Sequence, residues 1–227
     1  MEALFGITVK GATIIASDCN SARSIVKMKT DDDKQKVLSK HLIMAFTGES
    51  GDTLQFSEYV ERNLRLYGIR NHVELRPKAA AAWTRNQLAS SLRSRRPYQV
   101  NLLLGGFDIP SSTPALFWID YLGTLATVPF AAHGYGANFT MGTLDRYHRL
   151  DMSVEEGLVL LRRCIGELQK RFIVDLGKFQ VRVIDHNGVR DVDISSVPDP
   201  MAGLGVTPSS AQQPAGPPAT IATTASA

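Results

Sequence analysis

The chain has 227 residues, of which 44% are hydrophobic and 21% are charged, and its formal net charge is +3. These values fit one globular domain with some length to spare, and they argue against a nucleic-acid-coating protein or a chain with an acidic tail. No stretch reaches the roughly 18 consecutive apolar residues that a membrane span needs, and the first residues lack the basic segment of a secretory signal. The sequence therefore predicts an intracellular protein without a membrane segment.

The first part of the chain alternates in the manner of β-strands. Four β-prone runs precede any helical pattern, and they cover residues 4–9, 12–17, 24–28 and 41–46. Lys10-Gly11 between the first two runs predicts a hairpin turn, and the acidic residues 31–33 predict a solvated loop. The largely apolar fourth run predicts a strand that is covered on both faces.

Two helices follow these strands. Apolar residues recur at helical spacing over residues 52–66, where Ser50 or Asp52 can cap the start and Gly68 can end the helix. Pro77 stands where a second helix would begin, because proline is favoured in the first helical turn. Residues 79–92 are rich in helix formers and predict the body of this second helix.

A second block of strands and helices completes the pattern. Further strands are predicted at residues 98–105, 115–121, 123–128, 131–135, 179–185 and 190–194. Gly105-Gly106 is expected to form a turn at a strand end. Helices are predicted at 137–147 and 153–171, and the second begins with Ser153 and Glu156 in the spacing of a capping box. Asn187-Gly188 between two β runs indicates a hairpin.

The order of these blocks predicts the architecture. Strands, two helices, strands, two helices and strands suggest an α+β fold with two antiparallel sheets and helix pairs on their outer faces. We expect one domain at residues 1–197. Residues 198–227 are almost entirely Pro, Ala, Gly, Ser, Thr and Gln, a composition that predicts a disordered tail.

The cysteines, the histidines and one basic run are the remaining residues that could indicate a metal site, a disulfide or nucleic-acid binding. Cys19 and Cys164 are expected to be reduced thiols, and the scattered histidines show no metal-ligand spacing, so we expect no metal and no cofactor. His133, beside the glycines at 134 and 136, is expected to make a structural hydrogen bond. A basic run at residues 91–97 could bind nucleic acid, although a solvated helix end is the simpler interpretation.

Several motifs together resemble the β-type subunits of the eukaryotic 20S proteasome. They are the strand at residues 10–18, the strand-to-helix junction at 46–52, the glycine turn at 134–136 with the following 142–145, and the start of a late helix at 151–156. These matches occur in order across residues 2–194. The resemblance implies the four-layer αββα sandwich of N-terminal nucleophile hydrolases, in agreement with the order of the blocks.

Active members of this family use a threonine at the mature N-terminus as nucleophile and its free amine as base. In this sequence the resemblance assigns the family aspartate to Asp18 and the family lysine to Lys34. The threonine position is occupied by Glu2 and the glycine-turn serine by Tyr135. The late aspartate and serine correspond to positions near Phe172 and Asp175. A carboxylate at Glu2 cannot act as the hydroxyl nucleophile, so Asp18 and Lys34 are expected to be vestigial.

The resemblance therefore implies a non-catalytic structural subunit in the cytoplasm and nucleus. Its partners would be neighbouring β subunits, α-ring subunits and the opposing β ring of a twenty-eight-subunit particle, which serves ubiquitin-dependent proteolysis. Two alternatives stay open from the residues alone. One is a free-standing N-terminal nucleophile amidohydrolase, and the other is an RNA-binding module that uses Arg93, Arg95 and Arg96.

Overall fold

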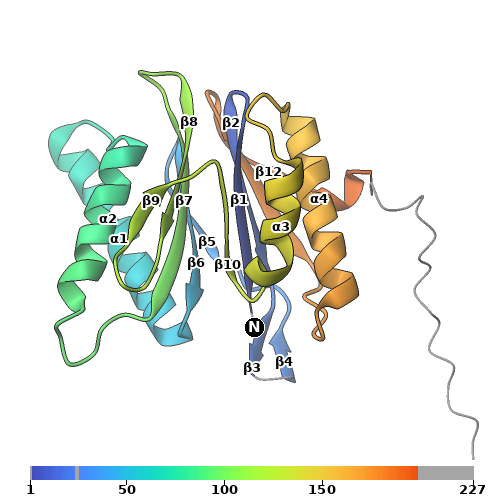
Figure 1. The fold of residues 1–227 in the computed structure, drawn as a ribbon. Coiled ribbons are helices and arrows are strands. Elements are labelled where there is room, and N and C mark those ends of the chain that lie inside the picture. The colour runs from blue at the N-terminus through green and yellow to red at the C-terminus, as the bar shows by residue number, and fades with distance from the viewer. Residues whose placement is uncertain (1, 24–25, 199–227) are drawn as a thin grey trace, which may run out of the picture.

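The structure is a computed structural model that describes residues 2–23 and 26–198. Two five-stranded antiparallel sheets form its centre (Figure 1). The first sheet has the order β10-β1-β2-β11-β12, with β1 Ala3–Val9, β2 Ala12–Asp18, β10 Phe130–Gly134, β11 Phe179–Asp185 and β12 Gly188–Val192. The second has the order β5-β6-β7-β8-β9, with β5 Gln35–Ser39, β6 Leu42–Gly48, β7 Val100–Asp108, β8 Thr113–Ile119 and β9 Leu125–Thr127.

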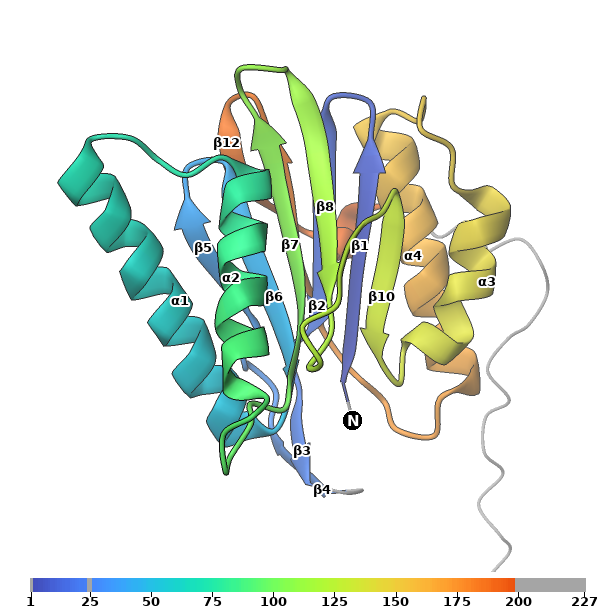
Figure 2. The same cartoon turned by 60° about the vertical axis from the view of Figure 1, so that its left-hand side comes forward.

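Two pairs of helices cover the outer faces of the sheets. The helices α1 (Ser50–Asn71) and α2 (Pro77–Ser91) lie on the second sheet, and α3 (Ala137–Tyr147) and α4 (Val154–Arg171) lie on the first (Figure 2). A small ribbon of β3 (Ser21–Arg23) and β4 (Val26–Lys29) projects from one end, and a short 3-10 helix spans Ile194–Ser196. The predicted four-layer αββα sandwich is thus confirmed.

Three apolar clusters hold the layers together. Along β1, side chains alternate between two of them: Phe5 and Ile7 pack beneath α3 and α4, whereas Leu4 lies between the sheets with Leu103 and Leu116. A third cluster joins the second sheet to α1 and α2. Every residue of β1 and β2 is buried. Burying one large apolar side chain contributes about 1.5–3 kcal/mol, so this central hairpin is a principal source of stability.

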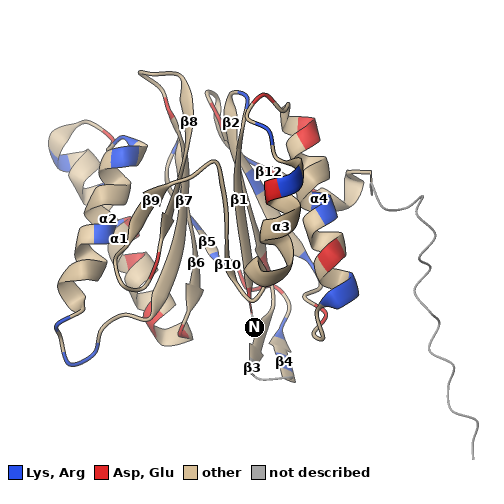
Figure 3. Ribbon diagram, viewed as in Figure 1, with Lys and Arg blue, Asp and Glu red and all other residues tan. Residues whose placement is uncertain are grey.

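The Lys, Arg, Asp and Glu residues lie mostly in the outer helices and connecting turns (Figure 3). The helix α4 illustrates the pattern, because its buried positions are apolar or glycine and its exposed face carries both signs of charge. Within the described residues, no helix has the length and apolar character that crossing a membrane requires.

Most predicted elements are present, and three local expectations were wrong. In addition, the strands β3 and β5 were not predicted. The helix α1 continues past Gly68 to Asn71, and its N-cap residue is Glu49 rather than Ser50 or Asp52. The Asp52 carboxylate instead accepts a hydrogen bond from the Gln99 amide at 3.0 Å, which ties α1 to the segment before β7.

Gly105-Gly106 lies inside β7 and does not form the expected turn. A Cβ atom on Gly105 would lie 2.6 Å from the Ile15 side chain of the facing sheet and 2.9 Å from that of Thr13. Glycine at this position therefore lets the two sheets approach closely. Of the remaining expectations, the third predicted strand falls partly at residues 24–25 and the tail at 199–227, and both segments lie outside the described residues.

Candidate functional site

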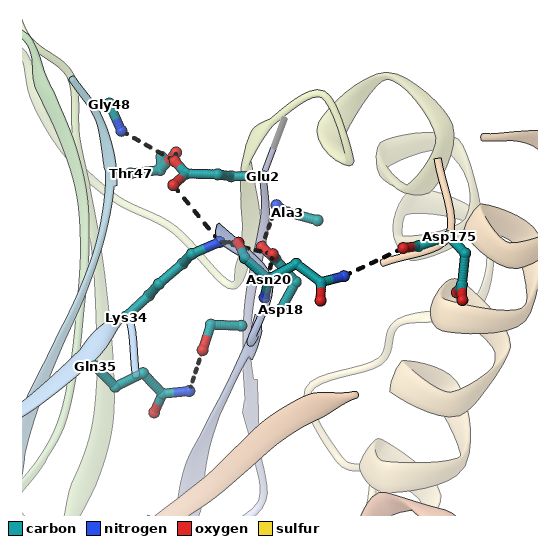
Figure 4. Close-up of polar contacts among 10 residues, drawn as sticks. Glu2, Ala3, Asp18, Asn20, Lys34, Gln35, Thr47, Gly48 and Asp175 are labelled. Carbon is teal, nitrogen blue, oxygen red and sulfur yellow. Dashed lines mark hydrogen bonds and ion pairs between the residues drawn. The ribbon is translucent and has the colours of Figure 1, made fainter. Parts of the chain in front are cut away.

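The candidate site lies where the two sheets meet at one end. The strands β1 and β2 pair with Leu4 opposite Ser17, so the residue before β1, Glu2, lies beside the end of β2 at Asp18. From the second sheet, Lys34 directly precedes β5 and Thr47 lies near the end of β6. The Phe46 amide bonds to the Lys34 carbonyl at 3.0 Å, which holds these two strand ends together. The topology thus brings together residues that are far apart in sequence (Figure 4).

Asp18 and Lys34 form a fully buried ion pair. Their side chains are 0% and 2% exposed, and Lys34 Nζ lies 2.6 Å from Asp18 Oδ2. Asp18 also accepts hydrogen bonds from the amides of Ala3 at 2.8 Å and Asn20 at 3.2 Å, and Lys34 donates to the Asn20 carbonyl at 2.7 Å. Burial raises the pKa of the Asp18 carboxyl, and the neighbouring ammonium group opposes that rise. Both predicted residues therefore lie at the site as a hydrogen-bonded pair.

Glu2 brings a second carboxylate to the same ammonium group. Its Oε1 atom lies 3.5 Å from Lys34 Nζ, and its Oε2 atom accepts hydrogen bonds from the Thr47 hydroxyl and, at 3.2 Å, from the Gly48 amide (Figure 4). The Glu2 side chain is 27% exposed. The Glu2 side chain ends in a carboxylate and has no hydroxyl group, which is the group that a threonine nucleophile uses.

A pocket of about 690 Å³ opens beside these residues, and its lining includes Glu2, Ser21, Thr47, Gly48 and Tyr135. The Tyr135 side chain, at the predicted serine position, is exposed and lies at the edge of this pocket. The ring of Phe172 lies 6.2 Å from that of Tyr135, centroid to centroid. Tyr135 therefore contributes to the lining of the pocket, and Phe172 packs against its ring.

Asp175 reaches the site only through its backbone. Its carbonyl accepts a hydrogen bond from the Asn20 side chain at 3.2 Å, while its own carboxylate is exposed and lies 3.8 Å from the Lys27 ammonium group. The structure therefore places the carboxylates of both Asp18 and Glu2 against the Lys34 ammonium group, whereas the Asp175 carboxylate takes no part in these contacts.

The contacts of Glu2 with Thr47 and Gly48 were not predicted. The motif at residues 46–52 placed both residues at a strand-to-helix junction but did not indicate which side chain faces them. Gly48 has a φ of +144°, and a Cβ atom there would lie 2.1 Å from the Gln99 carbonyl oxygen. Glycine is favoured where the backbone adopts such a φ or approaches another strand closely. A glycine at this predicted strand end was therefore the one sequence signal that the backbone there is constrained.

His133 makes the structural hydrogen bond that was predicted. Its Nε2 atom lies 3.1 Å from the Leu102 carbonyl oxygen, and its ring stacks on Trp118 with the centroids 5.0 Å apart. Burial lowers the pKa of His133 to about 4, so the ring is neutral at physiological pH. Its hydrogen bond joins β10, an edge strand of the first sheet, to β7, the central strand of the second.

The remaining candidate residues lie outside the site. Both cysteines are free; burial raises the pKa of the Cys164 thiol to about 12 and also raises the pKa of the Cys19 thiol. The arginines at 93, 95 and 96 are exposed in the segment after α2. Among the described residues, no cluster of three or more His, Cys, Asp or Glu side chains could hold a metal ion.

Comparison with known proteins identifies similar chains over almost the whole fold. The family model described as Proteasome subunit matches residues 2–184. Proteasome subunit beta type-4 of Saccharomyces cerevisiae is 47% identical over 193 residues, which cover 85% of this chain and 98% of that protein. Proteasome subunit beta type-2-A of Arabidopsis thaliana is 43% identical over 191 residues, covering 84% and 93% of the two chains. Proteasome subunit beta type-2 of Dictyostelium discoideum is 40% identical over 192 residues, covering 84% and 96%.

Proposed function

Since this chain belongs to the proteasome subunit family as a β-type member, we propose that it is a non-catalytic structural subunit of the 20S core particle. The observation that carries this proposal is Glu2. The family's nucleophilic threonine position holds a glutamate, and its carboxylate is engaged with Lys34, Thr47 and Gly48. The buried Asp18–Lys34 pair then has a structural role, because it joins the ends of the two sheets.

The proposal includes a position in the β ring. We infer that the chain corresponds to proteasome subunit beta type-2, the non-catalytic subunit at the fourth position. The segments that most resemble this subunit are residues 98–106 and 129–137, with residues 1–7 and 168–172 in addition. The similar proteins are named beta type-4 in the fungi and beta type-2 in the plant and the slime mould. The chain has comparable sequence identity to the fungal beta type-4 proteins and to the beta type-2 proteins. This supports the interpretation that the two names denote the same position in the ring.

The proposed partners are two neighbouring β subunits, an α-ring subunit and the opposing β ring in a twenty-eight-subunit particle. The function of this particle would be ubiquitin-dependent proteolysis in the cytoplasm and nucleus. Obligate interfaces bury about 2,000 Å² or more and are rich in apolar residues. The helix α1 offers suitable surface, because it exposes several large apolar side chains: Leu54, Tyr59, Leu66, Tyr67 and Ile69.

Native mass spectrometry of the endogenous protein tests the assembly. We expect the chain in a particle of twenty-eight subunits, and recovery solely as a monomer would contradict the proposal. Intact-mass analysis of the same sample tests the missing nucleophile. A mature form that begins with Thr, Ser or Cys and turns over a peptide substrate by itself would favour the alternative amidohydrolase.

A further inference from the structure

We propose that Lys34, Thr47 and Gly48 form a carboxylate-binding site and that the Glu2 side chain is its built-in ligand. This inference goes beyond the absence of a nucleophile. It assigns a binding function to groups whose only role so far is structural, and it predicts that the occupied site excludes small carboxylates from solution.

The first argument is that donors converge on both carboxylate oxygens. Lys34 has three N–H groups. Two of them serve Asp18 and the Asn20 carbonyl, which leaves the third for Glu2 Oε1 at 3.5 Å. The other oxygen, Oε2, receives the Thr47 hydroxyl and the Gly48 amide. One ammonium, one hydroxyl and one backbone amide are a suitable donor set for a carboxylate, because hydrogen bonds that involve charged groups are the stronger ones.

The second argument is that these donors are held in place independently of Glu2. Lys34 is 2% exposed and is fixed by its two other hydrogen bonds. The Gly48 backbone packs against the Gln99 carbonyl, which also accepts the Glu49 amide at 3.0 Å. All three donors lie in or beside the second sheet, whereas Glu2 precedes the first. Removing the Glu2 side chain would therefore leave a preformed site.

The third argument concerns access. Glu2 lines the pocket of about 690 Å³ and is 27% exposed, so a solute the size of acetate would reach the donors once the side chain is shortened. In the natural chain, Glu2 is covalently connected to the site. An attached ligand has a very high effective concentration, which prevents competition by dilute free carboxylates such as peptide C-termini.

The test compares Glu2→Ala with Glu2→Gln and Glu49→Ala in the full-length chain, in the assembly in which it is isolated. Glu2→Gln keeps a side chain of the same shape in the site, and Glu49→Ala removes a different carboxylate from the rim of the pocket. Thermal unfolding is followed with sodium acetate on the order of 100 mM and with sodium chloride at equal ionic strength, because a ligand that binds only the folded state raises Tm.

We expect acetate to raise Tm by a few degrees above the chloride value for Glu2→Ala alone, in a saturable manner. An equal response to chloride would show simple charge screening and would overturn the proposal, as would no response to either salt. Should Glu2→Ala not accumulate, a high-resolution structure of the unaltered protein decides the question. Glu2 must contact Gly48 and Thr47 there, and a Glu2 side chain directed into the open pocket would refute the assignment. Neither outcome affects the test of assembly.

Discussion

At the scale of single residues, Lys34 is a charged side chain in a buried position. It lies between the carboxylates of Asp18 and Glu2 and is almost completely buried. Breaking a buried ion pair by removing one partner costs about 3–5 kcal/mol, because the other charge is left without compensation. Lys34→Met retains most of the side-chain volume but strands the carboxylate of Asp18. We therefore expect a large fall in the free energy of unfolding.

Urea denaturation of the single and double variants checks this expectation. Adding Asp18→Asn to Lys34→Met removes the stranded charge, so the double variant should be more stable than Lys34→Met alone. A double variant that is destabilised by the sum of the two single changes would show that the charges do not interact.

His133 makes stability depend on pH. Its pKa is about 4 in the folded chain and near 6.5 when unfolded. Between these values the unfolded chain takes up a proton that the folded chain does not, so stability is complete above pH 6.5 and falls as the pH decreases toward 4. The full interval corresponds to about 3 kcal/mol. His133→Gln should remove most of this dependence.

The measurement is the free energy of unfolding at several pH values between 7 and 4, on the same chain with and without His133→Gln. His186→Gln is the matched control, because His186 lies in the exposed turn before β12. If the slope between these pH values is the same in all three proteins, the buried ring of His133 is not its source.

At the scale of elements, the start of α4 has a complete capping box. The Ser153 hydroxyl accepts the Glu156 amide at 3.2 Å, and the Glu156 carboxylate accepts the Ser153 amide at 2.8 Å. Ser153→Ala should cost about 1 kcal/mol, as N-cap losses typically do. Ser50→Ala is the control, since Ser50 lies inside α1 and no side-chain capping bond forms at the start of that helix. Chemical denaturation should show a loss for the first variant and almost none for the second.

The close contact between the sheets at Gly105 gives another prediction. In Gly105→Ala the new methyl group would collide with Ile15, and overpacking of this kind typically costs about 1–3 kcal/mol. Ile15→Val removes the methyl group that is closest to the new atom, so it should restore part of the loss when combined with Gly105→Ala. Gly142→Ala in α3 has open space around it and should be neutral or stabilising. Thermal unfolding of the four proteins distinguishes these outcomes.

The sequence correctly predicted those features of the fold that depend only on neighbouring residues. The capping residue Ser153, the helix-starting Pro77 and the Asn187-Gly188 turn each act on their own neighbours, and the structure has all three. The strand β5 was missed because its sequence is polar, and it forms by pairing with β6. The role of Gly105 depends on Ile15, which lies in the other sheet, and such a contact leaves no trace in the local pattern.

The same distinction applies to the candidate site. Asp18 and Lys34 were identified through the resemblance, and the structure brings them together. The contacts of Glu2 with Thr47 and Gly48 join a residue of the first sheet to the end of β6 in the second. They depend on how the two sheets stack, so neither spacing nor composition could predict them.

At the scale of the whole molecule, substitutions on the outer face of α1 can test the proposed assembly. Leu66 and Ile69 are 41% and 66% exposed in the single chain. Leu66→Glu and Ile69→Glu should leave the fold of the chain intact but reduce its incorporation into the particle, because a charge at a desolvated interface is costly. Gln55→Glu, an exposed change on the same helix, is the control. Incorporation is measured as the fraction of tagged chain that sediments with the particle.

The arrangement of the strands has a consequence for the order in which a nascent chain can fold. All strands of the second sheet, with α1 and α2, come from residues 35–127, so this half can form while synthesis continues. The hairpin of β1 and β2 leaves the ribosome before the other described strands, yet it pairs with β10 and β11, whose last residue is Asp185. This early apolar hairpin can therefore complete its pairing only after a much later segment has been made, and during that interval its unpaired strand edges are prone to aggregation.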